Sequence, residues 1–270
     1  MTKVAAVQMV SSASLERNLA EAGRLLGAAR RGGAIVAALP ENFAFMGCAE
    51  ADKFAIAEQP GSGPIQSFLA STARELGLWL VGGTVPLRVP GESRLAAACL
   101  VLDEQGRQVA RYDKVHLFDV AIPGKEESYR ESSTMRPGDE PVCVDTPAGR
   151  LGLAVCYDLR FPELFRQLLA MGAEWFCLPS AFTAPTGRAH WEVLLRARAI
   201  ENLSHVVAPA QSGFHANGRE THGDSMIVDC WGRVLARLPR GSGVVVADIG
   251  LVRQREVRQN FPSIDHRRLP

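Results

Sequence analysis

The chain has 270 residues, of which 47% are hydrophobic and 22% are charged, and its formal net charge at pH 7 is +1. These values are ordinary for a globular protein and allow one large domain or two small ones. A net charge so close to zero offers no electrostatic attraction to nucleic acid or to an anionic membrane, so neither is expected as a partner. The sequence therefore predicts a protein that acts on small molecules.

The first strand-like run, Val4–Met9, begins without the apolar core and cleavage site of a secretory signal. No uncharged apolar run approaches the roughly 18 residues of a membrane span. The six cysteines are scattered without CxxC pairs, and Cys99 and Cys177 lie in apolar runs. This pattern indicates reduced core residues in a cytoplasmic protein. The histidines show no HxxxH or HExxH spacing, so neither a metal nor another cofactor is expected.

Strand-like and helix-like patterns alternate through the first half of the chain. Apolar residues recur at helical spacing over residues 15–29 and 65–76, and Gly32 and Gly77 follow as stop signals. Strands are predicted over Val4–Met9, Ile35–Leu39, Leu78–Val85 and Ala97–Leu102, with a Pro/Gly loop over Pro86–Gly91.

The second half repeats this alternation, with helices predicted over Leu164–Met171 and His190–Leu203. Strands are predicted over Val142–Asp145, Leu151–Val155, Trp175–Leu178, Val206–Ala210, Ser225–Asp229 and Val244–Ile249. Alternating strands and helices indicate a layered α/β fold. Because a single flat sheet of about ten or more strands is improbable, we expect two sheets packed face to face with helices outside. No linker or break in composition divides residues 1–270, so one domain is predicted.

The long segment Phe118–Pro141 is predicted to be a loop without regular structure. Segments of this length are usually functional or disordered. Because it directly follows Lys114, we expect it to cover an active site.

Three groups of complementary chemistry each follow a predicted strand. Cys156 lies where Leu151–Val155 runs into a polar turn and a helix, a position that favours a thiolate. Glu41 and Lys114 likewise come after apolar strands. A thiol, a carboxylate and an ammonium can supply a nucleophile, a proton carrier and a partner for an oxyanion. The alternative for a lone cysteine is a buried structural residue.

These segments resemble the Glu–Lys–Cys triad of the nitrilase superfamily, the carbon–nitrogen hydrolases. The resemblance covers nearly the whole chain, and it is strongest to the Nit branch, which contains deaminated glutathione amidases and ω-amidases. The motifs that carry it are Pro40–Glu41, Tyr112–Asp119, Cys156–Leu164 and Ala189–Asn202.

The resemblance implies a four-layer αββα sandwich and a cysteine-dependent amidase. In such an enzyme Cys156 attacks the carbonyl carbon, and Glu41 carries the thiol proton to the leaving nitrogen. Ammonia then leaves, and water hydrolyses the thioester acyl-enzyme. Lys114 would hold the oxyanion together with the backbone N–H of Tyr157. With Lys114 beside it, the thiol of Cys156 is expected to have a lowered pKa.

Glu131 matches a second glutamate of the branch, which would position Lys114 or the substrate amide. The alternative is a solvated loop carboxylate like Glu126 and Glu127. The loop is one residue longer before Glu131 than is common in the branch.

Arg160 has two interpretations: it forms an ion pair with Glu163 that organises the turn after Cys156, or it binds a substrate carboxylate. Thr183 and Thr186 lie where the family's substrate loop lies and are expected substrate contacts. His190 and Trp191 are expected to pack their helix, and Glu192 and Arg196 are spaced for an i,i+4 surface pair.

Two positions depart from the branch. Asp224 stands where histidine is usual, and Cys230 stands where proline is common. Neither belongs to the triad. These departures affect the surroundings of the site or a contact between subunits, and leave the reaction class unchanged.

The expected substrate is a small carboxylate-bearing amide, first of all deaminated glutathione, with metabolite repair as the role. The alternatives are α-ketoglutaramate, the substrate of an ω-amidase, or a nitrile or carbamoyl compound. A non-catalytic binding protein on the same fold would lack a triad residue, and all three are present. A metal hydrolase is disfavoured by the histidine spacing.

Family members commonly assemble, so a homodimer or a larger homo-oligomer is expected. The apolar helices flanking the triad strands would supply the interface. The basic tail Asp265–Pro270 either crosses to a partner subunit or frays.

Overall fold

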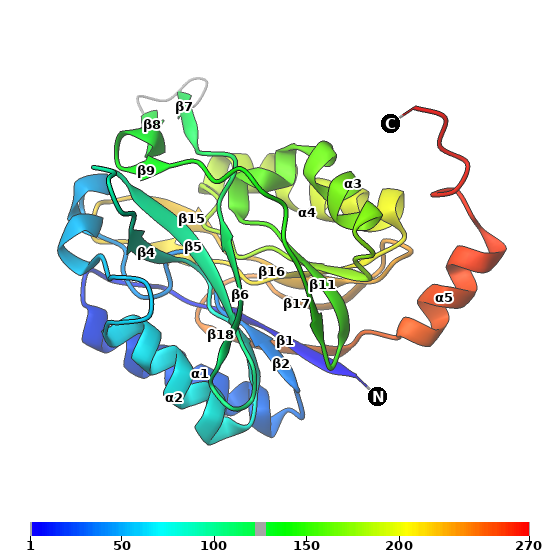
Figure 1. Cartoon of the computed structure of the whole chain (residues 1–270), viewed down its shortest axis with the longest axis horizontal. Coiled ribbons are helices and arrows are strands. Elements are labelled where there is room, and N and C mark those ends of the chain that lie inside the picture. The colour runs from blue at the N-terminus through cyan, green and yellow to red at the C-terminus, as the bar shows by residue number, and fades with distance from the viewer. Residues whose placement is uncertain (1, 122–127, 270) are drawn as a thin grey trace.

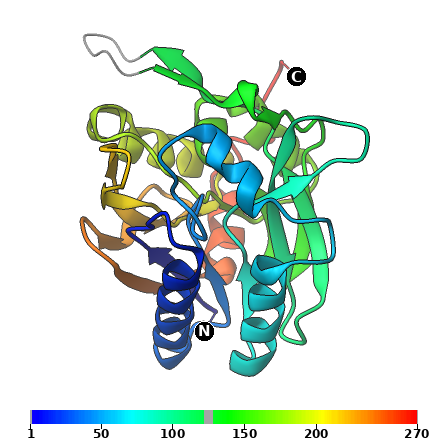
Figure 2. The ribbon, with the colours of Figure 1, turned by 90° about the vertical axis from the view of Figure 1, so that its left-hand side faces the viewer.

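The computed structural model describes residues 2–121 and 128–269. Two sheets pack face to face, and helices cover the outer face of each, which gives four layers (Figure 1; Figure 2). The predicted αββα sandwich is confirmed. The part of the chain from residue 122 to 127, which contains the predicted loop residues Gly124, Glu126 and Glu127, lies outside the described residues.

The first sheet is formed by β1 (Lys3–Gln8), β2 (Val36–Ala38), β3 (Trp79–Val81), β4 (Val85–Arg88), β5 (Leu95–Leu102), β6 (Gln108–Asp113), β9 (Met135–Arg136) and β18 (Gly243–Asp248). Its hydrogen-bonded order is β18–β1–β2–β3–β5–β4, and β6 and β9 also pair with β5. The helices α1 (Leu15–Arg31) and α2 (Pro64–Leu76) cover its outer face. The left-handed Gly77 ends α2 as the sequence predicts.

The second sheet is formed, in spatial order, by β10 (Cys143–Thr146), β11 (Gly149–Leu153), β12 (Trp175–Cys177), β13 (His205–Ala208), β16 (Ser225–Val228) and β17 (Val234–Leu238). The helices α3 (Pro162–Ala170) and α4 (Ala184–Asn202) lie on its outer side. The helix α5 (Leu251–Asn260) lies at the end of the sandwich and leads into an extended C-terminal segment (Figure 1).

The alternation of side chains along β1 explains why the fold has four layers. Val4 and Ala6 point into the core between the two sheets, whereas Ala5 and Val7 point into the core beneath α1 and α2. Successive side chains of a strand face opposite sides of the sheet. A strand that is buried on both faces therefore reads as a continuous apolar run.

Several predicted boundaries were wrong. The predicted strand Leu78–Val85 is two strands, β3 and β4, because Gly82–Gly83 breaks it, and β4 continues into the predicted loop Pro86–Gly91. The helix predicted from His190 begins at Ala184. The sequence interpretation also missed β6, β17 and α5, and two short hairpins described next.

The predicted loop Phe118–Pro141 contains regular structure in its described part. The hairpin of β7 (Asp119–Ala121) and β8 (Ser128–Arg130) leads into a 3₁₀ turn, η2 (Glu131–Ser133), and then into β9. A second hairpin, β14 (Ser212–Phe214) with β15 (Glu220–His222), lies near the start of α4. Two further 3₁₀ turns are η1 (Glu50–Ile56) and η3 (Cys156–Arg160).

The parallel strands of both sheets end on the same side of the molecule. The strands β1, β2 and β3 run parallel, and so do β11, β12 and β13. Glu41 follows the end of β2 and Cys156 follows the end of β11. In α/β folds the crevice outside the carboxyl ends of such strands is where ligands bind.

Gly83 allows the segment that carries Glu41 to approach β4. Its φ of +58° lies in the left-handed region, and an added Cβ would lie 2.2 Å from the carbonyl oxygen of Pro40. The next residue, Thr84, accepts a hydrogen bond from the N–H of Asn42 at 2.9 Å. The backbone on both sides of Glu41 is therefore fixed by the Gly83–Thr84 segment.

We predict that Gly83→Ala lowers the free energy of unfolding by roughly 3–5 kcal/mol, because backbone strain adds to the clash with Pro40. Gly91→Ala is the matched control: Gly91 has a φ of +77° but no atom within 4 Å of an added Cβ. It should cost only about 1–2 kcal/mol of strain. Urea unfolding measures both, and equal losses would contradict the close approach at Pro40.

Candidate active site

Lys114 is the centre of a buried charge cluster. Its side chain is 1% exposed, and its Nζ donates to Glu41 Oε1 at 2.8 Å and to Glu131 Oε2 at 2.9 Å. The ammonium also lies 3.1 Å from Glu131 Oε1. The ammonium of Lys114 is thus shared by two carboxylates: that of Glu41, which follows β2, and that of Glu131, which begins η2. The alternative, that Glu131 is a solvated loop carboxylate, is wrong, and the favoured interpretation that it positions Lys114 is supported by this contact.

The two carboxylates fix the protonation state of this lysine. Burial alone would lower the pKa of the Lys114 ammonium, but Glu131 and Glu41 raise it well above its usual value. Burial would raise the pKa of Glu131, yet Lys114 and Lys53 lower it. Lys114 therefore stays charged and cannot serve as a base near neutral pH.

Glu131 also fastens the hairpin segment to the site. The N–H of Phe118 donates to Glu131 Oε2 at 2.7 Å, and the N–H of Glu131 donates to the carbonyl of Phe118 at 3.4 Å. Phe118 lies four residues after Lys114 in the chain. The ion pair and these hydrogen bonds hold Lys114, Phe118 and Glu131 together, with Phe118 at the pocket wall.

Cys156 lies at the first position of η3 with a φ of +47°. A positive φ is uncommon for a residue with a side chain and costs roughly 1–2 kcal/mol. Its N–H donates to the carbonyl of Pro179 at 3.0 Å, which ties the turn to the end of β12. Asn42, next to Glu41, also has a positive φ of +55°. Strained residues of this kind cluster at functional sites.

The expected lowering of the thiol pKa was wrong. Burial raises the pKa of the Cys156 thiol well above its ordinary value, and the negative charge of Glu41 raises it further. Lys114 acts in the opposite direction but does not compensate. The sequence interpretation counted the lysine and the helix end but not the burial or the carboxylate. Cys156 is therefore a thiol at neutral pH, and it needs a base to become a nucleophile.

Asp158 connects the turn of Cys156 to the segment of Lys114. It is fully buried, and its Oδ2 accepts from the Tyr112 hydroxyl and from the N–H of Val155, both at 2.7 Å. Its Oδ1 accepts from the N–H of His116 at 3.0 Å. Tyr112 and His116 flank Lys114 two residues away on each side. One carboxylate thus holds the positions of the thiol and the ammonium relative to each other.

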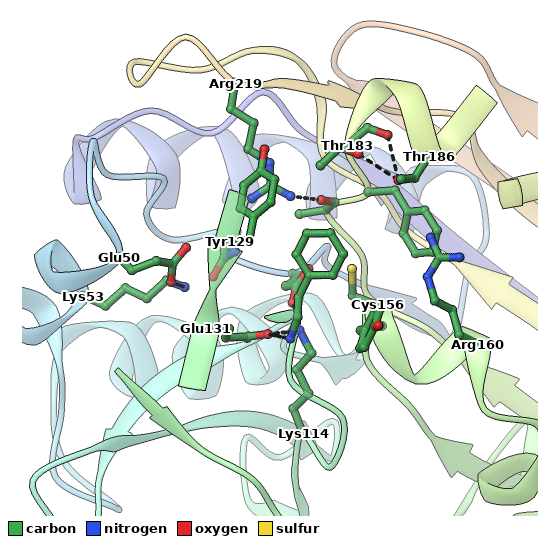
Figure 3. Close-up of a pocket in the computed structure, with 16 residues that line it drawn as sticks. Glu50, Lys53, Lys114, Tyr129, Glu131, Cys156, Arg160, Thr183, Thr186 and Arg219 are labelled. Atoms are coloured by element: carbon green, nitrogen blue, oxygen red, sulfur yellow. Dashed lines mark hydrogen bonds and ion pairs between the residues drawn. The ribbon is translucent and has the colours of Figure 1, made fainter. Parts of the chain in front are cut away.

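A pocket opens beside these groups, and Figure 3 shows its side chains. The four residues that the sequence predicts as substrate contacts, Tyr157, Arg160, Thr183 and Thr186, all line it together with Glu41, Lys114, Glu131 and Cys156. The hydroxyls of Thr183 and Thr186 lie 2.8 Å apart. Thr186 belongs to the first turn of α4 and not to a loop, because α4 begins at Ala184.

Arg160 faces the pocket and not its neighbour Glu163. Among the described residues the two side chains form no ion pair, so the first interpretation of Arg160 was wrong. The guanidinium lies over the rings of Tyr157 and Phe182, with 5.7 Å and 5.3 Å between Cζ and the ring centroids. It also contacts Nδ1 of His190 at 3.2 Å. His190 is therefore an exposed partner of Arg160 and not a packing residue, whereas Trp191 is buried as expected.

The sequence interpretation missed several residues that line the pocket. Phe118 lies in the motif Tyr112–Asp119 but was not assigned to the site. Arg219 lies in the turn between β14 and β15. Lys53, Tyr129 and Phe182 gave no local signal, because only the fold brings them to the pocket. The guanidinium of Arg219 lies over the ring of Tyr129, with 4.9 Å from its Cζ to the ring centroid.

The two departures from the branch pattern lie outside the pocket lining. Asp224 is buried with a φ of +62° and forms an ion pair with Arg237. Its Oδ2 also lies 3.8 Å from Nε2 of His222. Cys230 is buried. The predicted surface pair of Glu192 and Arg196 is confirmed at 3.4 Å.

Over residues 2–121 and 128–269, no three or more His, Cys, Asp or Glu side chains are grouped so that they could hold a metal ion. In the same part of the chain, no helix has the length and apolar character needed to cross a membrane.

Comparison with known proteins gives a consistent result. Residues 3–259 match the carbon–nitrogen hydrolase family model. A curated relative from Synechocystis sp., named deaminated glutathione amidase, is 44% identical over 266 residues, which are 97% of each chain.

Solved structures agree with this match. The NitFhit protein of C. elegans has a TM-score of 0.90 and 38% identity over 99% of this chain, which spans 65% of the length of that protein. Saccharomyces cerevisiae Nit3, a member of branch 10 of the nitrilase superfamily, has a TM-score of 0.89 and 28% identity, and the match covers 99% of this chain and 97% of Nit3.

We predict that the thiol of Cys156 titrates above its ordinary value of 9.0, and that Glu41→Gln lowers this midpoint by about 1 pH unit or more. The reason is that the variant removes a negative charge while Glu131 keeps Lys114 protonated. The ultraviolet absorbance of the thiolate, taken as a difference from Cys156→Ser, measures the midpoint. Glu75→Gln, an exposed change on α2, is the control. An unchanged midpoint in Glu41→Gln would contradict the influence of this carboxylate.

Proposed function

The chain belongs to the carbon–nitrogen hydrolase family and so hydrolyses carbon–nitrogen bonds other than peptide bonds, and we propose that its substrate is deaminated glutathione. The observation that carries the proposal is the buried cluster of Lys114, Glu41 and Glu131 in the pocket that contains Cys156. This cluster supplies every group that amide hydrolysis through an acyl-enzyme needs. The name of the relative from Synechocystis supports the choice of substrate.

The chemistry of this substrate changes the expected leaving group. Deaminated glutathione carries a carboxylate at each end, and its γ-amide joins a 2-oxo acid to cysteinylglycine. Both of its amide nitrogens bear carbon, so hydrolysis releases an amine and not the ammonia expected from the sequence. Ammonia would leave only from a primary amide such as α-ketoglutaramate. The two arginines of the pocket, Arg160 and Arg219, favour the substrate with two carboxylates.

The first half of the reaction forms the acyl-enzyme. Glu41 takes the proton of the Cys156 thiol as the sulfur attacks the carbonyl carbon of the γ-amide. The negative charge that develops on the carbonyl oxygen is stabilised by Lys114 and by the N–H of Tyr157. The latter is free to donate because it lies in the first turn of η3. The carbon–nitrogen bond then breaks, and Glu41 gives its proton to the departing amine.

The second half releases the acid. Glu41, again a carboxylate, takes a proton from water as the water attacks the thioester. The carbon–sulfur bond breaks, the 2-oxo diacid leaves, and Cys156 recovers its proton. Glu131 has no step of its own in this scheme; it holds the ammonium of Lys114 in place. Arg160, Thr183 and Thr186 would bind the acyl part of the substrate.

A homodimer or larger assembly is part of the proposal. Val193 and Ile200 on α4 are 68% and 48% exposed, and the rings of Trp231 and Phe261, each about half exposed, lie 5.4 Å apart. Together these four side chains form the α4 patch. The proposed compartment is the cytoplasm, because six unpaired cysteines suit a reducing environment.

We predict that the wild-type protein converts deaminated glutathione to cysteinylglycine and the 2-oxo diacid. Cys156→Ala should lower kcat by a factor of roughly 10⁴ or more, because it removes the nucleophile. Liquid chromatography with mass detection of both products measures the rate. Cys143→Ser, on an outer strand away from the pocket, is the matched control and should keep full activity. Retained activity in Cys156→Ala would exclude an acyl-enzyme on this sulfur.

We predict that the α4 patch is covered by a second copy of the chain. Trp231→Arg should shift the protein toward the monomer in size-exclusion chromatography with light scattering, because a charge would be buried in an apolar contact. Phe214→Arg, which changes a 72% exposed ring on β14, is the control. A wild-type monomer at micromolar concentration would refute the assembly.

A further inference from the structure

We propose that a second chamber next to the reacting groups binds the leaving peptide of the substrate, and that Arg219 binds the carboxylate at the far end of this peptide. The inference rests on the proposed function, since it says where one part of that substrate lies. The second chamber is the cavity between the segment Phe45–Glu50 and the turn Asn217–Arg219, with Tyr129 on another side.

The second chamber is continuous with the pocket of Cys156. Glu50, Lys53, Tyr129 and Arg219 line both cavities. The space directly beside the reacting groups is about 30 Å³, which is too small for a dipeptide. The second chamber is about 410 Å³, within the range of roughly 300–1,000 Å³ that small-molecule sites occupy. Of these two cavities, the second chamber therefore has the room for the bulk of an extended leaving group.

The guanidinium of Arg219 is held in place without being neutralised. Its Nη2 donates to the carbonyl of Ala181, and its Cζ lies over the ring of Tyr129. Its Nε is buried and has no hydrogen-bond partner in the described structure. Among the described residues no carboxylate pairs with it. A cation without a carboxylate partner at the wall of a cavity favours an anionic ligand.

Two other cations near the pocket, Lys53 and Arg160, differ from Arg219 in their partner or their position. Lys53 is paired with Glu50 at 2.6 Å, so its charge is already neutralised. Arg160 lies on a different side of Cys156 from Arg219, as Figure 3 shows. A substrate with a carboxylate at each end can therefore place one end at Arg160 and the other at Arg219. Its scissile amide then lies at Cys156, between them.

A two-by-two kinetic comparison tests this assignment. Wild type and Arg219→Met are each assayed with deaminated glutathione and with its analogue in which the glycine carboxylate is a carboxamide. In the wild type, the carboxamide should lower kcat/KM by roughly 10- to 100-fold, mainly through KM, because a charge-assisted hydrogen bond is lost. Arg219→Met should react slowly with both compounds and show little difference between them.

Arg74→Met is the matched control, because it removes an exposed guanidinium of α2 that lines neither cavity. It should keep the wild-type penalty for the carboxamide. An equal penalty in wild type and Arg219→Met would overturn the assignment and leave the proposed function intact. Failure of the wild type to hydrolyse deaminated glutathione would overturn both.

A second variant covers the case in which Arg219→Met does not fold. Ala49→Trp fills the second chamber from an exposed position on the Phe45–Glu50 segment. It should lower kcat/KM for deaminated glutathione at least about 10-fold more than for α-ketoglutaramate, whose leaving ammonia does not reach the chamber. Equal losses on the two substrates would overturn the assignment of the chamber.

Discussion

The site depends on one ammonium shared by two carboxylates in a buried position. Glu131 and Glu41 raise the pKa of the buried Lys114 ammonium and keep it charged, and Lys114 in turn lowers the pKa of Glu131. The cluster of one cation and two anions keeps a net negative charge beside Cys156. Burial and, after it, the charge of Glu41 raise the pKa of the Cys156 thiol, so the sulfur holds its proton at rest.

The fold maintains this cluster by joining pieces of both sheets. Glu41 follows β2 of the first sheet, whereas Cys156 follows β11 of the second. Asp158 spans the gap, because it accepts hydrogen bonds from both sides of Lys114 while it sits two residues after the thiol. The sandwich therefore brings the ends of strands from both sheets to one crevice. The buried carboxylate of Asp158 fixes these strand ends there.

The strands that carry the site could be predicted from the sequence, because they are buried on both faces and read as apolar runs. The break at Gly82–Gly83 lies inside such a run and was therefore not predicted. The strand β6 was missed because its polar residues are typical of a loop. The start of α4 was missed because Pro185 and Gly187 read as loop residues, although proline suits the first turn of a helix.

The electrostatics of the site could not be predicted in the same way. The motifs placed a lysine, a glutamate and a cysteine together, but the sign of the thiol shift depends on burial and on distances that no motif contains. Arg219 could not be assigned for a related reason: only the folded chain places its guanidinium at the wall of both cavities.

The protonated state of Cys156 has a consequence for the lifetime of the protein. Oxidants and alkylating agents attack thiolates far faster than thiols. A nucleophile that keeps its proton at rest, in a narrow buried space, is chemically quiet toward peroxide and stray electrophiles. In the proposed reaction the sulfur becomes reactive only when a bound carbonyl accepts its electrons as the proton departs. The proton that the sulfur retains at rest thus protects the site from such reagents.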